Sequence, residues 1–392
     1  MDVEALRSEF PALERTIYLN SGWQGPPPRR VTEAIEERLR AEAESGPTSK
    51  PMYEQAVETR PRAREVGARL LNASVEEISL TPRTTDGLTT VVSGLHWQEG
   101  DEVITFDIEH PSVLIPCHLL QRKYGVTVRC LPLAPDEDHW SILEKVRSAL
   151  NENTRLVFFS HIQFHSGLRM PVEEIRAMTR PLGVRMLVDG AQTAGHIDLD
   201  MRALDCDYYA IPGQKWLSGP SGTGALFVRR DRIAEIELNQ VSFRSVANMA
   251  ELHPTFHEYR IDDENIEKFG GDPPSIALTL GFIEAAEFAL EIGAGAIEER
   301  SMALAGRAKD LLVETPGVTL LSPTARAGSS GLVSFAVEGV EPQVIVDRLW
   351  DEDSVVLRTV RNPDGVRFSF AWFNTEDEVD RVLEAIRKIG TG

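Results

Sequence analysis

The sequence is poor in cysteine and has no long apolar run, and both absences narrow the classes of protein to consider. Its three cysteines, Cys117, Cys130 and Cys206, form neither a CxxC motif nor an even-numbered disulfide framework. That usage is typical of a reducing compartment, so we expect a cytoplasmic protein. No apolar run approaches the roughly 18 residues that a membrane-spanning helix needs. We therefore expect no membrane partner.

The sequence is also short of positive charge. It carries 41 lysines and arginines against 61 aspartates and glutamates, which gives a formal net charge of −20. Such a charge disfavours nucleic acid and acidic membrane surfaces as partners. The remaining composition, with 42% hydrophobic and 26% charged residues, is ordinary for a globular enzyme. Residues 1–15 indicate an acidic amphipathic helix rather than a signal peptide.

Short apolar runs alternate with helical patterns through the middle of the chain. Helical patterns at about 31–44 and 54–71 come first. The apolar runs that follow, separated by helical patterns such as 141–150 and 172–181, are ISLT, VITF, VTVRCL, LVFFSH and RMLVD. This alternation predicts an α/β fold with a mostly parallel, doubly wound sheet.

The length of the chain suffices for two domains. Residues 230–272 form a loop-rich region, and an alanine-rich helix over about 275–296 is expected to link to a second domain. There the runs VTLL, GLVSFAV and VRFSFAW predict the strands of a smaller α/β layer. We predict three parts: an N-terminal helix that packs with the small domain (1–15), a large domain (16–272), and a linker helix with the small C-terminal domain (273–392).

An acid and a lysine follow two neighbouring apolar runs. Asp189 ends the run RMLVD, and Lys215 follows the run that ends in Pro212-Gly213. Parallel sheets bind ligands at the carboxyl ends of their strands, where both residues are expected. This pair suits pyridoxal 5'-phosphate (PLP), because the lysine attaches the cofactor as a Schiff base and the carboxylate keeps the pyridine nitrogen protonated. Taken singly, Asp189 could instead cap a helix and Lys215 could lie on the surface.

Two further motifs fit the same cofactor. Thr84 and Thr85 follow a strand and open a helix, where backbone N–H groups and hydroxyls bind a phosphate dianion. The alternative is an ordinary threonine N-cap. His110 ends the strand VITFDI and could lie flat on the cofactor ring, or it could simply cap the next helix. A metal site is not expected, because the spacing of His161 and His165 would need a helix to bring both rings to one face.

Arg358 and Arg367 flank the turn Asn362-Pro363-Asp364-Gly365. Arginine pairs hold carboxylates in a bidentate manner, so these two are candidates for the α-carboxylate of an amino-acid substrate. The alternative is two solvated arginines.

These motifs together resemble the class V aminotransferase family of fold type I PLP enzymes, which includes cysteine desulfurases, cystine C–S lyases and isopenicillin N epimerase. The resemblance runs from YLNSGWQGP to RFSFAWFNTEDEVDRVL, with the motifs in family order. It is strongest to the C–S lyase branch, in the segments EHPS, SHIQFHSG, LVDGAQTAG, DYYAIPGQKWLSGPSGTGALFV, GLVSF and LRTVRNPDGVR.

The resemblance implies a role for each matching residue. Lys215 would carry the cofactor, Asp189 would pair with the pyridine nitrogen, and Gln192 would bind the phenolic oxygen. His110 would stack on the ring, and Thr84 and Thr85 would hold the phosphate. Arg367, with Arg358, would hold the substrate carboxylate, with Trp23 as a further candidate for the substrate pocket. A homodimer with shared active sites is also implied, in which the 240–272 loops reach toward the neighbour's phosphate pocket.

Three residues depart from the family pattern. Gln214 stands where a histidine commonly reaches the phosphate, and Gly270 stands near the position of a phosphate-binding threonine from the neighbour's loop. Both changes would weaken phosphate binding. His165 replaces an asparagine expected beside cofactor and substrate, and its imidazole could act as an acid toward a leaving group.

The absence of a cysteine between Arg358 and Arg367 decides among the family's reactions. Cysteine desulfurases need a cysteine nucleophile in that stretch, and this chain has none there. We therefore expect a C–S lyase that performs β-elimination on a cysteine- or cystine-like amino acid, giving pyruvate, ammonia and a thiol or persulfide. The alternatives are an epimerase or racemase of the isopenicillin N epimerase type, and desulfurase-like sulfur transfer. Transamination and a catalytically silent binding protein are weaker alternatives.

Overall fold

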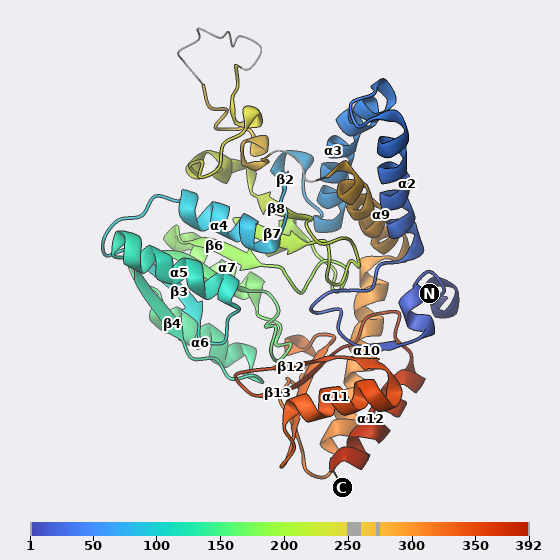
Figure 1. Cartoon of the computed structure of the whole chain (residues 1–392). Helices are drawn as coiled ribbons and strands as arrows, with labels where there is room; N and C mark the ends of the chain where they lie inside the picture. Colours follow the sequence, from blue (N-terminus) through green and yellow to red (C-terminus); the bar gives the residue numbers. More distant parts are fainter. Residues whose placement is uncertain (1, 249–259, 272–274, 391–392) are drawn as a thin grey trace.

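A seven-stranded sheet forms the centre of the larger part of the molecule (Figure 1). The computed structural model describes residues 2–248, 260–271 and 275–390. The strand order is β2-β8-β7-β6-β5-β3-β4, and only β8 runs antiparallel to its neighbours. In sheet order the strands are Ile78–Leu80, Gly224–Val228, Tyr208–Pro212, Arg185–Asp189, Thr154–Ser160, Glu102–Phe106 and Thr127–Leu131.

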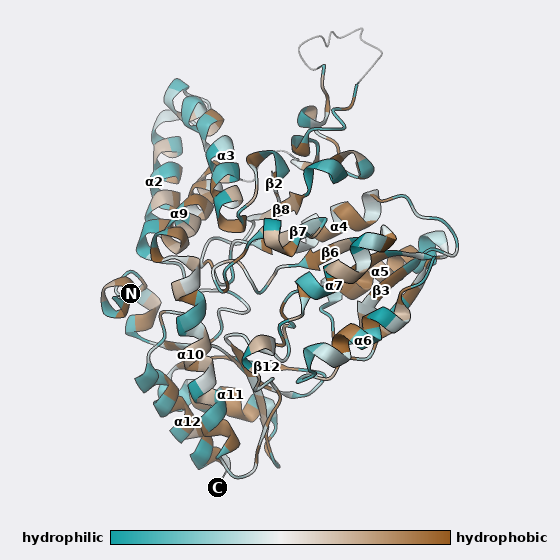
Figure 2. Cartoon of the chain, turned by 180° about the vertical axis from the view of Figure 1, so that it is seen from behind, coloured by the Kyte–Doolittle hydropathy of each residue, from teal (hydrophilic) through white to brown (hydrophobic). Residues whose placement is uncertain are grey.

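Helices cover both faces of this sheet because its central strands are apolar on both sides. In β5, Leu156 and Phe158 face one core cluster, while Val157 and Phe159 face the other. The first face is covered by α4 (Thr84–Gly94) and α5 (Pro111–Tyr124). The second is covered by α3 (Lys50–Leu71), α6 (His139–Ala149), α7 (Val172–Thr179) and α8 (Met201–Leu204). Figure 2 shows the apolar strands enclosed by helices with polar outer faces. The predicted doubly wound α/β fold is confirmed.

A second, antiparallel sheet lies at the C-terminal end of the molecule (Figure 1). Its order is β12 (Arg358–Val360), β13 (Gly365–Ser369), β10 (Leu332–Val337) and β9 (Val318–Leu320). It shares a separate core cluster with α10 (Ala294–Val313), α11 (Pro342–Asp353) and α12 (Glu376–Gly390). The predicted domain boundary between residues 272 and 273 lies outside the described residues, and the division into domains stays a prediction.

The single helix predicted over 275–296 is wrong in one respect. The structure has two helices there, α9 (Ile276–Ile292) and α10, which are separated at Gly293. Gly293 has φ +92°, a conformation that glycine adopts without strain and that ends α9. Helix α9 packs against α3 and α2 (Arg29–Ser45), whereas α10 packs against the small sheet.

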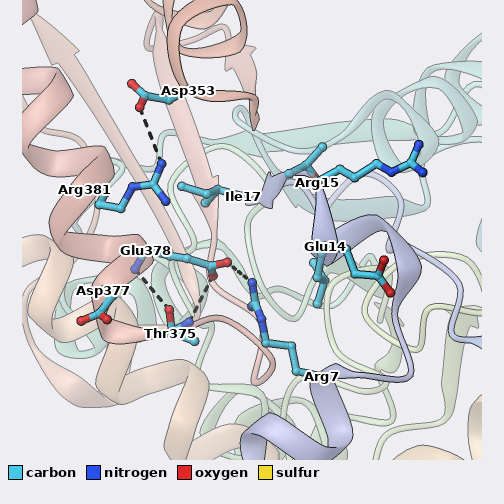
Figure 3. Close-up of a pocket in the computed structure, with 11 residues that line it drawn as sticks. Arg7, Glu14, Arg15, Ile17, Asp353, Thr375, Asp377, Glu378 and Arg381 are labelled. Atoms are coloured by element: carbon cyan, nitrogen blue, oxygen red, sulfur yellow. Dashed lines mark hydrogen bonds and ion pairs between the residues drawn. The ribbon is translucent and has the colours of Figure 1, made fainter.

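The N-terminal segment connects the two parts of the molecule. Its predicted helix is shorter than expected, with α1 at Val3–Arg7 and a 3-10 turn at Pro11–Glu14. The short strand β1 (Ile17–Tyr18) pairs with β11 (Val355–Val356). Figure 3 shows the groove of about 350 Å³ beside this segment, where Arg7 forms an ion pair with Glu378 of α12. None of the helices in the described ranges combines the length and apolarity needed to cross a bilayer.

Candidate active site

A cavity of about 270 Å³ lies where the carboxyl ends of β6 and β7 face the β12–β13 hairpin. Every residue predicted for the site lines it except His165 and Gly270. The predicted residues that it brings together are Trp23, Thr84, Thr85, His110, Asp189, Gln192, Gln214, Lys215, Arg358 and Arg367.

Lys215 and Asp189 form the buried floor of the cavity. Asp189 is the last residue of β6 and Lys215 follows β7, so the parallel pairing of these strands brings the two side chains together. Burial lowers the pKa of Lys215 to about 8; Arg367 and Arg358 act in the same direction, and Asp189 opposes them. Burial raises the pKa of Asp189, while Lys215 lowers it. The amine is therefore partly neutral near neutral pH, as attachment to a carbonyl carbon requires.

Asp189 does not cap a helix, because residues 191–196 form turns rather than a helix. Its Oδ1 accepts a hydrogen bond of 2.8 Å from the backbone N–H of Ala191 in this turn. The side chain also lines the cavity. The contact with Ala191 holds the carboxylate in place without using both of its oxygens.

Gln192 is held by its neighbours on both ends of the amide. Its Nε2 donates to the carbonyl of Gly22 (2.8 Å), and its Oε1 accepts from Trp216 Nε1 (2.8 Å). The Trp216 indole stacks on His196, with ring centroids 3.6 Å apart. One Nε2 hydrogen is left over, so Gln192 can still donate to a ligand oxygen.

The first turn of α4 forms one wall of the cavity. Thr84 and Thr85 are the first two residues of this helix, and its N-cap is Arg83, which makes no side-chain capping bond. The ordinary threonine N-cap is therefore not what this segment forms. Thr85 Oγ1 lies 2.9 Å from Ser112 Oγ on the first turn of α5. Free N–H groups at a helix start favour an anion there.

His110 both caps α5 and lines the cavity. Its Nδ1 accepts a hydrogen bond of 3.1 Å from the backbone N–H of Ser112. Burial, with Lys215 and the two arginines, lowers the pKa of His110 to about 4, so the ring is neutral at pH 7. A neutral ring packs on an aromatic ligand at a lower desolvation cost than an imidazolium.

Arg358 and Arg367 lie directly opposite each other on β12 and β13. Arg367 is 1% exposed, and its Nη1 donates to the carbonyl of Phe164 (2.6 Å), while its Nε and Nη2 have no hydrogen-bond partner. The guanidinium of Arg358 lies 4.6 Å from the centroid of the Trp23 ring. Burial lowers the pKa of both arginines. Two like charges at paired positions destabilise a sheet unless an anion compensates them.

His165 lies behind the cavity wall rather than in it. The ring that lines the cavity is Phe164, and the His165 ring packs against it with centroids 3.5 Å apart. Burial and the charges of Arg367 lower the pKa of His165 to about 4, and its Nδ1 has no partner. The predicted role of His165 as an acid stays a prediction.

Glu109 anchors the loop that carries Phe164. Its carboxylate accepts from Gln163 Nε2 (2.6 Å) and from the backbone N–H of Ser160 (3.0 Å). Burial raises the pKa of Glu109 to about 7.

Gly270 is separate from this cavity and packs against an arginine. An added Cβ at Gly270 would lie 2.0 Å from Arg60 Nη2. Arg60 is buried, with its Nε 3.2 Å from Glu267, so glycine is what lets the guanidinium occupy this position. A threonine at residue 270 would require this guanidinium to shift.

Sequence reasoning missed several cavity residues. Arg83, Ser112 and Ala191 line it, and each lies next to a predicted residue in the chain or close to one. Gly22 lines it as well, and an added Cβ there would lie 3.0 Å from Arg367 Nη2. Proximity to the predicted motifs was the available signal for the first three. Only the tertiary structure places Gly22 beside Arg367.

The residues fit PLP at each of its reactive groups. The buried amine of Lys215 can attach the aldehyde, and the buried carboxylate of Asp189 can pair with the pyridine nitrogen. The N-terminus of α4 can bind the phosphate. Gln214 Oε1 and Arg367 Nη2 are buried polar atoms without a partner, as expected of groups that bind a ligand. The expectation that the site holds no metal stays a prediction.

Comparison with known proteins gives the family. A family model described as Aminotransferase class-V matches residues 17–382. The chain is 29% identical to isopenicillin N epimerase of Streptomyces clavuligerus over 400 residues, with 98% of each protein covered. It is also 29% identical to a probable cysteine desulfurase of Halalkalibacterium halodurans over 412 residues, covering 99% of this chain and 98% of that protein.

Solved structures that resemble this chain indicate the same family. The cystine C–S lyase C-DES, in complex with its product cysteine persulfide, matches with a TM-score of 0.88 and 30% identity over 96% of this chain and 99% of that one. A C-DES mutant with glycine linked to its PLP cofactor matches with a TM-score of 0.87 and 30% identity, over 97% and 98% of the two chains. The predicted resemblance to this family is confirmed. The chain therefore belongs to the class-V aminotransferase family of PLP-dependent enzymes, and PLP is its cofactor.

Proposed function

We propose that this protein is a C–S lyase that performs β-elimination on a cysteine- or cystine-like amino acid. Loss of the Cα proton and cleavage of the Cβ–S bond release a thiol or persulfide and leave aminoacrylate, which water hydrolyses to pyruvate and ammonia. The observation that carries the proposal is Arg367, a buried guanidinium with unpartnered Nε and Nη2 at the cavity wall. Among the described residues no carboxylate forms an ion pair with it, so a substrate carboxylate is the complement that it lacks.

The substrate carboxylate binds between Arg367 and Arg358. Arg358 adds a second charge at the paired strand position, and Trp23 covers its outer face. Compensation of the two like charges by one carboxylate stabilises the hairpin and fixes the orientation of the amino acid. Its Cα is thereby directed toward the floor of the cavity.

Lys215 supplies the base. When bound, PLP provides an electron sink that makes the Cα proton of an attached amino acid acidic. The lowered pKa of Lys215, about 8, leaves part of the amine neutral and able to take that proton near neutral pH. Asp189 holds a proton on the pyridine nitrogen, and neutral His110 packs on the ring.

The cysteines support elimination over sulfur transfer. Cys117 and Cys206 are buried, which raises their thiol pKa, and Cys130 is an exposed residue of β4, away from the cavity. None of the described residues lining the cavity is a cysteine. A persulfide leaves more readily than a thiolate, so a disulfide substrate needs no nucleophile from the enzyme. The similarity to C-DES, a cystine C–S lyase whose reaction product is cysteine persulfide, supports the same choice.

We also propose that the protein is a cytoplasmic homodimer with shared active sites. Gly270 and the rest of the 240–272 segment that is described do not line this chain's own cavity. In the dimer, this segment would reach the phosphate pocket of the neighbouring subunit.

The test is to mix PLP-loaded protein with L-cystine and to follow pyruvate and persulfide together. We expect both products, with Lys215→Ala inactive because it lacks the amine that attaches the cofactor and takes the proton. Arg367→Gln is expected to raise KM far more than it lowers the rate at saturation. Absence of pyruvate from correctly folded, PLP-loaded protein with cystine and cysteine S-conjugates would contradict the proposal.

Epimerisation is the second candidate, favoured by the 29% identity to isopenicillin N epimerase over 98% of both proteins. It uses the same Cα proton but returns it from the opposite face. Exchange of Cα–H for deuterium without release of pyruvate, across a panel of amino acids, would favour this reaction.

A further inference from the structure

Arg83 places a positive charge at the wall of the cavity that the first turn of α4 forms. It is the N-cap of this helix, in extended backbone (φ −156°, ψ 158°), and it lines the cavity together with Thr84, Thr85 and Gln214. Its guanidinium forms a bidentate pair with Asp86, with Nε–Oδ2 2.7 Å and Nη2–Oδ1 3.1 Å. These two bonds leave Nη1 available to a ligand.

The other cationic side chains of the cavity do not lie at the start of α4. Four lysine and arginine side chains line the cavity within the described part of the chain. Lys215 is buried beside Asp189, and Arg358 and Arg367 lie on the hairpin opposite α4. Gln214, which is next to Lys215, is neutral. Of the four, Arg83 alone is on the same element as the two threonines.

A phosphate group at this helix start needs a cation. A phosphate monoester carries a charge of about −1.5 to −2 at pH 7, whereas a helix N-terminus supplies roughly +0.5. Threonine hydroxyls and a glutamine amide add hydrogen bonds but no charge. The sequence also lacks the histidine and threonine that commonly serve this group, at residues 214 and 270.

We propose that Arg83 binds the phosphate of PLP through Nη1 and compensates for the charge that Gln214 does not supply. The inference rests on the proposed placement of that phosphate at the first turn of α4. The bidentate contact with Asp86 orients the guanidinium while no ligand is bound. The Asp86 carboxylate also places a negative charge near the phosphate, so phosphate binding through Nη1 does not require it.

The experiment compares PLP with pyridoxal, which lacks the phosphate. Apoprotein is titrated with each compound, and the dissociation constant is read from the visible absorbance of the bound cofactor. A charge-assisted hydrogen bond contributes enough for Arg83→Gln to weaken PLP binding about 10- to 100-fold. Pyridoxal binding should not change. Inorganic phosphate should compete with PLP for the wild-type protein and compete less well for this variant.

Three variants separate this role from a structural one. Arg83→Lys keeps the charge and should restore part of the affinity for PLP. Asp86→Asn should leave PLP binding as tight as in the wild type or tighter, because it removes a negative charge. Arg307→Gln breaks a similar bidentate pair with Asp380 (2.7 Å for both bonds) away from the cavity and should change neither affinity.

The outcomes identify which statement fails. Equal weakening of PLP and pyridoxal binding by Arg83→Gln, or equal weakening by Arg83→Gln and Asp86→Asn, would mean that Arg83 only stabilises the start of α4. Unchanged PLP affinity in Arg83→Gln would overturn the inference while leaving the lyase proposal intact. Failure of wild-type apoprotein to prefer PLP over pyridoxal would overturn the placement of the phosphate as well.

Discussion

At the scale of residues, Lys215 occupies a site that favours its neutral amine. Burial lowers its pKa to about 8, and Arg367 and Arg358 add to this effect. Asp189 acts in the opposite direction, because a nearby carboxylate stabilises the ammonium form. The balance between these neighbours sets the pH at which the amine can react.

The rate at which apoprotein captures PLP should therefore rise as the pH increases through about 8, since only the neutral amine attacks the aldehyde. Asp189→Asn removes the group that raises the pKa of Lys215, so the midpoint should move to lower pH. The measurement is the rate of appearance of cofactor absorbance across this range, with pyridoxal as a control for titration of the phosphate. A midpoint that moves to higher pH in Asp189→Asn would contradict the assignment of these neighbours.

At the scale of elements, α10 carries a buried lysine that faces the loop between β9 and β10. Lys309 is 5% exposed, and its Nζ donates to the carbonyl of Pro323 (2.6 Å) and to Ser329 Oγ (2.9 Å). Within the described ranges it has no carboxylate partner. Burial lowers its pKa to about 8. The helix thus carries a desolvation cost that depends on pH.

The free energy of unfolding should increase with pH between about 8 and 10.4, because the unfolded chain keeps this proton longer than the folded one. The penalty is fully present below pH 8 and is absent above about 10.4. Over the whole window it is on the order of 3 kcal/mol. Denaturant unfolding at several pH values, with wild type and Lys309→Met in the same cofactor state, measures the difference. A pH slope as large in Lys309→Met as in the wild type would contradict this account.

At the scale of the whole molecule, the N-terminal segment packs into two core clusters, with Phe10 and Leu13 in the one beneath the large sheet and Ile17 and Leu19 in the one of the small sheet. Phe10 is 1% exposed and contacts Phe288 of α9 as well as Trp372 and Phe373, which follow β13, with ring centroids 5.0–6.0 Å apart. Arg7 donates a hydrogen bond of 2.8 Å to the carbonyl of Phe373. It also forms the ion pair with Glu378 that Figure 3 shows. The cavity lies between the regions that this segment connects.

Phe10→Ala should lower the free energy of unfolding by about 3–5 kcal/mol, since it opens a cavity among three aromatic rings. Trp140 of α6, an aromatic residue that is 73% exposed, provides the control, and Trp140→Ala should change stability by about 0.5 kcal/mol or less. Denaturant titration monitored by circular dichroism measures both. Equal stability of the two variants would mean that Phe10 does not anchor the N-terminal segment in this core cluster.

The sequence by itself determined the fold class, the cofactor and the residues that follow the strands of the large sheet. Apolar runs that end in Asp189 and Lys215 are local signals, and the rule that parallel strands end at one edge brings such residues together without knowledge of side-chain packing. The ends of helices were predicted less well. The helix predicted over 275–296 is interrupted at Gly293, because a glycine at positive φ ends a helix even within an alanine-rich pattern.

Only the tertiary structure decided which neighbouring residues face the cavity. It places Phe164 in the wall and His165 behind it, and it joins Gly22 to Arg367 and Gly270 to Arg60, residues far apart in the chain. From the sequence, Arg358 and Arg367 could both have been solvated. The structure pairs them across two strands and buries Arg367. These features depend on long-range packing and on the loss of water around each charge, and neither is encoded in the local pattern of a single sequence.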